Sequence, residues 1–419
     1  MSDAEATLTA PPPGEFLPPP SSAIGRRAWL RQNLFSGPWS SVLTILMGLV
    51  LGWVALSLGD WVVNEARWGV VTENLRLYLV GRYPVEEQYR IWLSLTILSV
   101  LSGLSAAVFG AATRTLGIWL AAGQALLAGL AFISGLGIVI VLALLLNAAL
   151  VWAALFIALR WPVPRRPLLI AWFLSVPISL LLLSGLQGSP LEAVSEPLGV
   201  ALPTVSTNVW EGLLLTFILA IAGITLSFPL GVLLALGRRS TMPAVKLLST
   251  VYIETIRGVP LVTILFMADI MLPLFLPGEW RLDRVLRAMG GITLFSAAYV
   301  AENVRGGLQA IPSGQIEAAN AIGLNTIQTN VFIVLPQALR SVIPANVGLF
   351  ISLLKDTTLV TIVGLVEILN IGRAVLANPE WFGAQLEVYV FVAAVFFLMC
   401  YTMSQASYRL EASMGVGTR

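Results

Sequence analysis

The chain has 419 residues, of which 57% are hydrophobic and 11% are charged, and its formal net charge at pH 7 is +2. Because soluble globular proteins carry about 25% charged residues, this composition predicts a membrane protein with several spans. The net charge is too small to suggest nucleic acid as a partner.

Several kinds of chemistry lack the residues that they need. The sequence contains no histidine, and its single cysteine, Cys400, lies in an apolar stretch. A disulfide within one chain, a zinc site and Cys/His nucleophilic catalysis are therefore not expected. No Gly-x-x-x-x-Gly-Lys-Ser/Thr string occurs, so the chain is expected to have no phosphate-binding loop of its own. If ATP drives this protein, another subunit must bind the nucleotide.

Residues 1–34 are expected to form a disordered, cytoplasmic N-terminus. The stretch is rich in Pro, Ser and Ala up to Gly25 and cannot bury a core. Three arginines near its end precede an uncharged run over residues 32–59, which is long enough to span about 30 Å of hydrocarbon. Basic residues before a first span favour a cytoplasmic N-terminus.

Residues 35–209 are expected to contain about five membrane-spanning helices. After the first span, uncharged runs cover residues 91–113, 115–159 and 167–191. A straight helix over residues 115–159 would be about 67 Å long, roughly twice the thickness of the hydrocarbon layer. We therefore expect that run to fold back at Ser134–Gly137.

Residues 210–408 are expected to contain five more spans, which gives an all-α chain of about ten transmembrane helices. Arginines at positions 238 and 239 mark a cytoplasmic end after the first of these five. A polar stretch, residues 308–335, follows the third and is expected on the same side. Residues 409–419 are expected to form a cytoplasmic tail.

The polar stretch contains a short predicted helix over residues 315–322. Ser313 is placed to cap its start and Gly323 to end it. Within it, Glu317-Ala318-Ala319 puts a carboxylate beside two small residues. This arrangement suits a helix that lies in a groove of another protein.

A second helix is predicted to follow, because Asn325 and Gln328 have the spacing of a capping box, and to bend at Pro336. The string of Glu317-Ala318-Ala319, Gly323 and Ile333-Val334-Leu335-Pro336 resembles the cytoplasmic loop of permease subunits in bacterial ABC importers. A plain helix-turn-helix linker between two spans is the alternative. The resemblance implies that six residues couple the chain to an ATPase: Glu317, Ala318, Ala319, Gly323, Leu335 and Pro336.

Residues 210–408 resemble the five-helix core of polar amino-acid ABC permeases of the histidine and glutamine type. Two positions depart from the family pattern: Thr358 stands where Ser is usual, and Asn303 where an aliphatic residue is usual. The resemblance implies a C-terminal ABC type I importer core. The matching stretches, in order, are Glu254 to Pro260, Ala298 to Gly306, Pro312 to Ala319, Leu335 to Ala338 and Lys355 to Leu359.

The layout of the whole chain, including Gly81-Arg82-Tyr83-Pro84, resembles the larger permease subunit of general L-amino-acid importers. This implies a multi-pass protein of the bacterial inner membrane that moves polar or general L-amino acids into the cytoplasm. The implied partners are a paralogous permease, cytoplasmic ATPase subunits that bind ATP and Mg, an extracytoplasmic amino-acid-binding protein and membrane lipid. The chain itself is expected to be no enzyme and to hold no cofactor or metal.

Polar side chains in the core spans are candidates for the substrate path, because ionisable groups at membrane depth usually face a cavity, a partner or a path. An amino acid needs donors for its carboxylate and acceptors for its ammonium group. The candidates are Lys355, Asp356, Thr357, Thr358, Glu254, Arg257, Tyr299 and Glu302. Structural alternatives stay open for them: Lys355 and Asp356 could pair with each other, and Tyr299 could simply pack.

Two further pairs have the i,i+3 spacing of intrahelical ion pairs. Glu254 with Arg257 and Glu302 with Arg305 are expected to pair within their helices rather than to contact substrate. Asp269 has no neighbour of opposite charge in sequence. It could face a cavity, a partner helix or water.

Other function classes fit less well. An integral-membrane enzyme would need a nucleophile, base or metal set, which the sequence does not offer. A channel or an ATPase-independent transporter would need no docking helix for a motor. Import of another small polar solute remains the alternative for the substrate.

Overall fold

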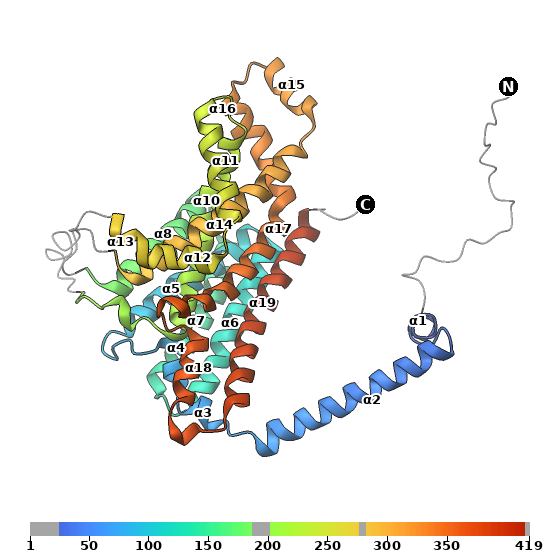
Figure 1. Ribbon diagram of the computed structural model, residues 1–419, viewed down its shortest axis with the longest axis vertical. Helices are drawn as coiled ribbons and strands as arrows, with labels where there is room; N and C mark the ends of the chain where they lie inside the picture. Colours follow the sequence, from blue (N-terminus) through green and yellow to red (C-terminus); the bar gives the residue numbers. More distant parts are fainter. Residues whose placement is uncertain (1–24, 187–201, 276–281, 415–419) are drawn as a thin grey trace. The chain divides into compact units, whose positions relative to one another are not determined.

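The computed structural model describes residues 25–186, 202–275 and 282–414. These residues form helices, with one isolated β-bridge between Gly212 and Glu367, so the all-α prediction is confirmed for them. The chain divides into two compact units, Met1–Ala66 and Arg67–Arg419 (Figure 1).

The first unit contains α1 (Arg26–Asn33), α2 (Pro38–Asp60) and the π-helix η2 (Trp61–Glu65). Pro38 lies in the first turn of α2, where its missing N–H removes no helical hydrogen bond. Helix α1 occupies part of the segment that we expected to be disordered, so that expectation is wrong for residues 26–33. Residues 1–24 lie outside the described part of the chain.

Six helices of the N-terminal extension open the second unit. The expected fold-back lies within the apolar run over residues 115–159, where Gly135 and Gly137 have φ of +64° and +101°. Glycine adopts these left-handed conformations without a steric penalty. The helices are α3 (Gly69–Thr72), α4 (Leu75–Val80), α5 (Tyr89–Val108), α6 (Ala111–Ile133), α7 (Ile138–Arg160) and α8 (Arg165–Ser184).

Hydrogen bonds between polar side chains join α5 to its neighbours. Gln124 of α6 donates to Ser99 at 2.9 Å, and the indole of Trp172 in α8 donates to Ser105 at 2.8 Å. These pairs satisfy polar groups inside an otherwise apolar bundle, where an unpaired group would be unfavourable.

The C-terminal half begins with α10 (Gly212–Arg238) and α11 (Pro243–Arg257). The chain bends by 109° between α11 and the segment that follows it, at the Gly258–Pro260 break. The remaining elements are α12 (Leu261–Phe266), η5 (Met267–Met271), α13 (Leu272–Phe275), α14 (Arg284–Gln309), α15 (Ser313–Ala321), α16 (Thr326–Gln328), η6 (Thr329–Val334), α17 (Leu335–Asp356), η7 (Thr357–Val363), α18 (Ile368–Leu376), η8 (Pro379–Trp381) and α19 (Gln385–Met414).

Helices α10 and α14 form the most extensive helix pair in the described part of the chain. At Gly231 a Cβ atom would lie 2.5 Å from Cβ of Val300, so only glycine permits this close approach. Buried Val300 and Val304 of α14 belong to one apolar cluster with Ala338 of α17. The centre of the C-terminal half is therefore built from α10, α14 and α17.

Among the described residues, eight helices are long and apolar enough to cross a membrane, or nine when α11 and the bent segment after it count as one span. Five of the eight lie in the N-terminal half, as predicted. Of the ten that we expected, α14 is the one that falls short of this measure, because its 26 residues include two charges near each end.

The extension and the core meet at the loop that follows α4. The guanidinium of Arg82 makes a bidentate contact with Glu211, with Nε–Oε2 and Nη2–Oε1 distances of 3.1 and 2.5 Å. Gly81 has φ of +58°, and a Cβ there would lie 2.2 Å from Cβ of Glu211. Burial raises the pKa of Tyr83 to about 12, so its hydroxyl stays protonated and donates to the Leu183 carbonyl at 2.9 Å.

Candidate functional site

Helix α15 projects from one end of the second unit (Figure 1). In sequence it lies between α14 and α17. It begins at Ser313, and Pro312 occupies the N-cap position without a side-chain hydrogen bond. The expected Ser313 cap is therefore wrong, because the helix starts one residue too early for that side chain to reach a free N–H. Proline before Ser313 fixes the extended backbone that precedes the first turn.

The end of α15 agrees with the sequence prediction. Gly323 has φ of +81°, and its N–H donates to the Asn320 carbonyl at 3.0 Å. The N–H of Leu324 donates to the Ala319 carbonyl at 3.1 Å, which completes a Schellman motif. Glycine ends the helix here because the motif needs a left-handed residue.

The second predicted cap is also confirmed. The Asn325 side chain accepts from the Gln328 N–H at 2.9 Å, and the Gln328 side chain accepts from the Asn325 N–H at 3.0 Å. The following turns, η6, have the wider π-type hydrogen bonding and end directly before Leu335 and Pro336. The irregular segment thus lies on the N-terminal side of Pro336.

The helix presents one of its two central alanines and buries the other. Glu317 and Ala318 are exposed, whereas Ala319 is 3% exposed and faces the protein itself. Of the remaining residues that we assigned to coupling, Gly323 and Pro336 are exposed and Leu335 is half-buried. The small side chain of Ala319 therefore allows close packing within this chain.

Three large apolar side chains around α15 were missed by the sequence reasoning. Ile322, Ile327 and Phe332 are 75%, 74% and 66% exposed. They belong to the α15–η6 loop, and our reading of that loop followed its polar and small residues. Large apolar side chains in residues 308–335, a segment predicted to lie outside the membrane, are the signal that identifies them.

The loop is connected to the core by both polar and apolar contacts. The Gln337 side chain of α17 donates to the Ile333 carbonyl at 2.8 Å and to Gln315 of α15 at 3.4 Å. Ile316 packs against the apolar cluster that contains Ala338. Helix α15 is therefore in direct contact with α17.

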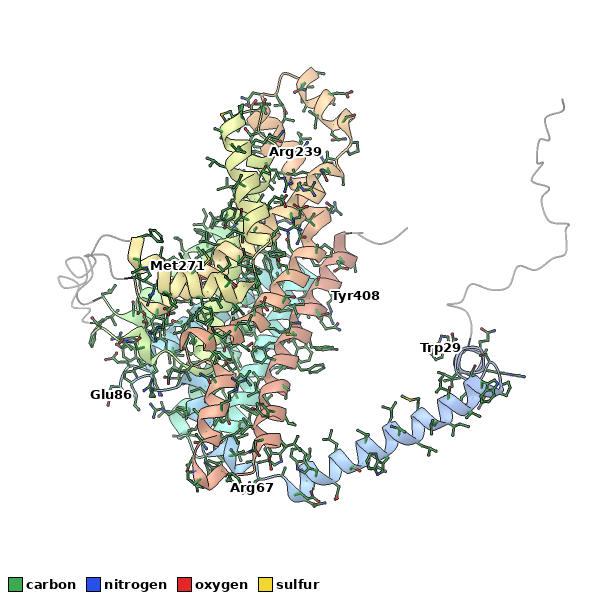
Figure 2. All side chains as sticks on the ribbon, in the orientation of Figure 1. Trp29, Arg67, Glu86, Arg239, Met271 and Tyr408 are labelled. Carbon is green, nitrogen blue, oxygen red and sulfur yellow. The ribbon has the colours of Figure 1, made fainter. Side chains whose placement is uncertain are left out.

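A network of five charged side chains joins α10, α11 and α14, and we call it the arginine–glutamate network. Its centre is Glu302, which binds Arg305 of its own helix, Arg238 of α10 at 3.3 Å and Arg257 of α11 at 3.4 Å. Glu254 binds Arg238 at 2.7 Å. Arg239, the neighbour of Arg238, lies toward the α15 end of the unit, opposite Arg67 (Figure 2).

One of the two predicted intrahelical pairs is confirmed and the other is wrong. Glu302 and Arg305 pair as expected. Glu254 pairs with Arg238 instead of Arg257, because Arg257 turns toward Glu302 on the neighbouring helix. The sequence spacing could not show that α10 supplies a competing arginine.

Tyr299 packs in the core and also receives a charge. Its ring lies 4.9 Å from that of Phe295, and the Arg257 guanidinium lies 5.7 Å from the Tyr299 ring centroid. This is the distance of a cation–π contact. The structure thus brings Arg257, Tyr299 and Glu302 together, three of the residues that we assigned to the substrate path.

Lys355 and Asp356 lie elsewhere, at the end of α17. Lys355 is exposed and Asp356 is half-buried, and in the described part of the chain they form no ion pair with each other. The hydroxyls of Thr357 and Thr358 donate to carbonyls one turn back, Leu354 at 2.7 Å and Lys355 at 2.8 Å. Adjacent helical residues point in different directions, which explains why the pair does not close.

Two residues left open by the sequence have partners on neighbouring helices. Asp269 of η5 contacts Arg287 of α14 at 3.1 Å, so it faces a partner helix. Asn303 of α14 donates to Asn346 of α17 at 3.0 Å. Asn303, which departs from the family pattern, therefore makes a contact between two core helices.

Several known membrane transport proteins are similar to this chain in sequence. Residues 227–413 match the family model described as the binding-protein-dependent transport system inner membrane component. The chain is 38% identical to the glutamate/glutamine/aspartate/asparagine transport system permease protein BztC of Rhodobacter capsulatus, over 95% of each chain. It is 36% identical to the inner membrane amino-acid ABC transporter permease protein YhdY of Escherichia coli, over 96% of each chain.

Two shorter matches cover the C-terminal half. The probable glutamine ABC transporter permease protein GlnP of Bacillus subtilis is 36% identical over 48% of this chain and 91% of that protein. A chain in the crystal structure of an amino acid ABC transporter with histidines is 28% identical, with a TM-score of 0.43, over 48% of this chain and 92% of that one.

These similarities show that the chain is a multi-pass bacterial inner-membrane permease with a C-terminal ABC type I importer core. The chain belongs to the family of amino-acid ABC transporter permeases. Members of this family are the membrane permease subunits of ABC importers.

Proposed function

We propose that this chain imports polar or general L-amino acids and is driven by a separate ATPase that binds α15. The observation that carries the proposal is the loop itself: a short helix with exposed Glu317 and Ala318, in a chain that matches amino-acid permeases over 95% and 96% of its length. ATP and Mg are bound by the ATPase, and this chain holds no cofactor or metal.

The exposed apolar residues add to the coupling surface. Ile322, Ile327 and Phe332 offer large apolar area beside Glu317, and burying one such side chain in a partner contributes about 1.5–3 kcal/mol. Glu317 then sets the orientation of the helix in the partner's groove. Gly323, Leu335 and Pro336 hold the shape of the loop and link it to α17.

Movement of α15 reaches the path through two routes. One is the Gln315–Gln337 and Ile316 contact with α17, which ends at Lys355-Asp356-Thr357-Thr358. The other is the arginine–glutamate network at the α15 end of α14. We assign these polar groups, together with Glu254, Arg257, Tyr299 and Glu302, to the path that an amino acid follows.

The remaining subunits follow from this assignment. A paralogous permease completes the path as a heterodimer, and a binding protein delivers amino acid on the extracytoplasmic side. The α15 loop faces the cytoplasm, and both termini lie there as well. The N-terminal extension packs around the core within the same compact unit from Arg67 onward.

The test is uptake of labelled L-amino acids by vesicles that hold this chain, its paralogue and the ATPase, with ATP inside and binding protein outside. Glu317→Ala is expected to lower ATP-dependent uptake about tenfold, since a lost charged hydrogen bond of about 1.5–3 kcal/mol weakens ATPase docking. Gly314→Ala, which keeps the carboxylate and changes a position with no atom within 4 Å, is the matched control.

Two outcomes would contradict the proposal. Uptake that is unchanged by Glu317→Ala would remove the coupling role of α15. ATP hydrolysis without uptake of any amino acid would leave an ABC permease whose cargo is another small polar solute.

A further inference from the structure

A cavity of about 540 Å³ lies where four distant segments of the second unit converge. Arg82 comes from the loop after α4, and Trp210 and Glu211 come from the segment before α10. The start of α14 and the turn at residues 364–366 close the other sides. Because Arg82 belongs to the N-terminal extension, the extension supplies part of the wall.

Two of the arginines at this cavity are already engaged. Arg82 makes its bidentate contact with Glu211, whose side chain is only 5% exposed. Arg287 contacts Asp269 at 3.1 Å. Each pair neutralises itself, so neither offers a free charge to a ligand.

The least engaged groups are adjacent, at the start of α14. Arg284 is 47% exposed, and its Nε lies 3.6 Å from the Asp269 carboxylate that Arg287 also contacts. Asp283 accepts the Val285 N–H at 3.2 Å through Oδ1 as the helix cap. The cavity therefore presents one guanidinium and one carboxylate with capacity to bind a further group.

We propose that this cavity is a binding site for a zwitterionic α-amino acid. The α-carboxylate binds Arg284, and the positive end of the α14 dipole favours a negative charge there. The α-ammonium binds the Asp283 carboxylate. With Asp269 behind the wall included, the cationic and anionic side chains at the cavity are equal in number. The cavity as a whole is therefore neutral, which suits a ligand that carries one charge of each sign.

The size and chemistry of the cavity agree with a small ligand. Its volume lies within the roughly 300–1,000 Å³ that small-molecule sites occupy. Trp210, which is 3% exposed, forms part of the wall of the cavity. A purely anionic ligand would leave Asp283 facing a like charge.

The position in the fold gives the site a role. Arg284 begins α14 and the α15 loop follows its last residue, Gln309, so the cavity and the loop lie at opposite ends of a helix about 39 Å long. This step rests on the proposed function, which places α15 in the cytoplasm. The cavity then opens on the extracytoplasmic side and holds amino acid between its delivery and its entry into the path.

The test labels the rim of the cavity in right-side-out vesicles that hold the complete importer without binding protein. Leu282, which is 41% exposed, is replaced in a Cys400→Ser background by Leu282→Cys and reacted with a membrane-impermeant maleimide. Asn208→Cys, at another exposed lining position, gives a second label if the first variant does not assemble.

L-glutamine is expected to slow the labelling about threefold at twice its Kd, since one site in three is then empty. Glutaramate, which lacks the α-ammonium, and L-glutaminamide, which lacks the α-carboxylate, should not protect. Arg284→Ala should abolish protection, whereas Lys246→Ala, an exposed charge on α11, should leave it unchanged.

Three results would overturn the site: no protection by any L-amino acid, equal protection by glutaramate, or protection only when binding protein is added. Uptake by the same complex, with ATP and binding protein, is measured in parallel. Retained uptake with no protection removes the site and leaves the proposed function in place, whereas absence of amino-acid uptake removes the proposed function.

Discussion

Glu302 contacts three arginines that come from three different helices. Its carboxylate binds Arg305, Arg238 and Arg257, and its side chain is 22% exposed, so solvent screens these contacts only in part. Arg257 is the last residue of α11 before the 109° bend. A single carboxylate therefore fixes the segment before the bend to α10 and α14.

Replacing this carboxylate tests whether the network holds the core in a transport-competent arrangement. Glu302→Gln is expected to lower ATP-dependent uptake by about tenfold or more, because a charge-assisted hydrogen bond contributes about 1.5–3 kcal/mol and about 1.4 kcal/mol corresponds to a factor of ten. Membrane insertion, measured by protein recovered from the membrane fraction, should be normal. Glu302→Asp should retain part of the activity.

Lys246→Gln is the matched control, since it removes an exposed charge from α11 outside the network. Equal uptake by Glu302→Gln and the unmodified chain would show that transport does not depend on the network. A similar loss in both variants would point to α11 as a whole.

Helix α15 depends on the conformation of the residue that ends it. The Schellman motif needs Gly323 at φ of +81°, and no atom lies within 4 Å of the position where its Cβ would be. A substitution there acts through the backbone alone. Its effect is therefore easier to interpret than that of a substitution in a packed core.

Gly323→Val is expected to weaken the coupling of ATP hydrolysis to transport, because a branched residue disfavours the left-handed backbone by about 1–2 kcal/mol. The measurement is substrate-stimulated ATP hydrolysis in reconstituted vesicles. Gly323→Asn should be tolerated better, since Asn adopts this conformation more readily. Gly314→Ala, inside α15 with no atom within 4 Å, is the control, and unchanged stimulation in Gly323→Val would refute the prediction.

The N-terminal extension from Arg67 onward and the core form one compact unit. Arg82 and Glu211 connect them across 129 positions of sequence, whereas the hydrogen bond from Tyr83 to Leu183 of α8 lies within the extension. Arg67 at the far end donates its backbone N–H to Glu387 of α19 at 3.0 Å. The extension is thus attached to the core at more than one place.

Breaking the first of these contacts should be detected as a loss of stability. Arg82→Ala leaves the buried Glu211 carboxylate without its bidentate partner, which is expected to lower the free energy of unfolding by about 1–3 kcal/mol. The midpoint of thermal unfolding in detergent should fall accordingly. The double variant Arg82→Ala, Glu211→Ala should lose less than the two single variants together, since they remove the same interaction.

Strict additivity in that cycle would contradict the coupling between the two residues. Arg76, which donates to the Tyr83 carbonyl at 3.0 Å without contacting Glu211, provides a comparison: Arg76→Ala should add to Glu211→Ala.

Contacts between residues that are close in sequence could be predicted from the sequence, whereas contacts between distant residues could not. The Gly323 stop, the Asn325–Gln328 capping box and the fold-back at Ser134–Gly137 were predictable, because each depends on residues within a few positions of one another. The predicted N-cap of α15 was wrong by one residue, because Pro312 rather than Ser313 occupies that position. Such an error is small in sequence, yet it decides whether a side chain can reach a free N–H.

The membrane class, the five spans of the N-terminal half and the resemblance of the loop could all be predicted from the sequence, because hydrophobic run length, glycine and capping residues act locally. The pairing of Glu254 with Arg238, of Asp269 with Arg287 and of Arg82 with Glu211 became visible only in the folded chain. Charges attract whatever oppositely charged group the fold brings near, so their partners depend on packing between helices rather than on spacing along the chain.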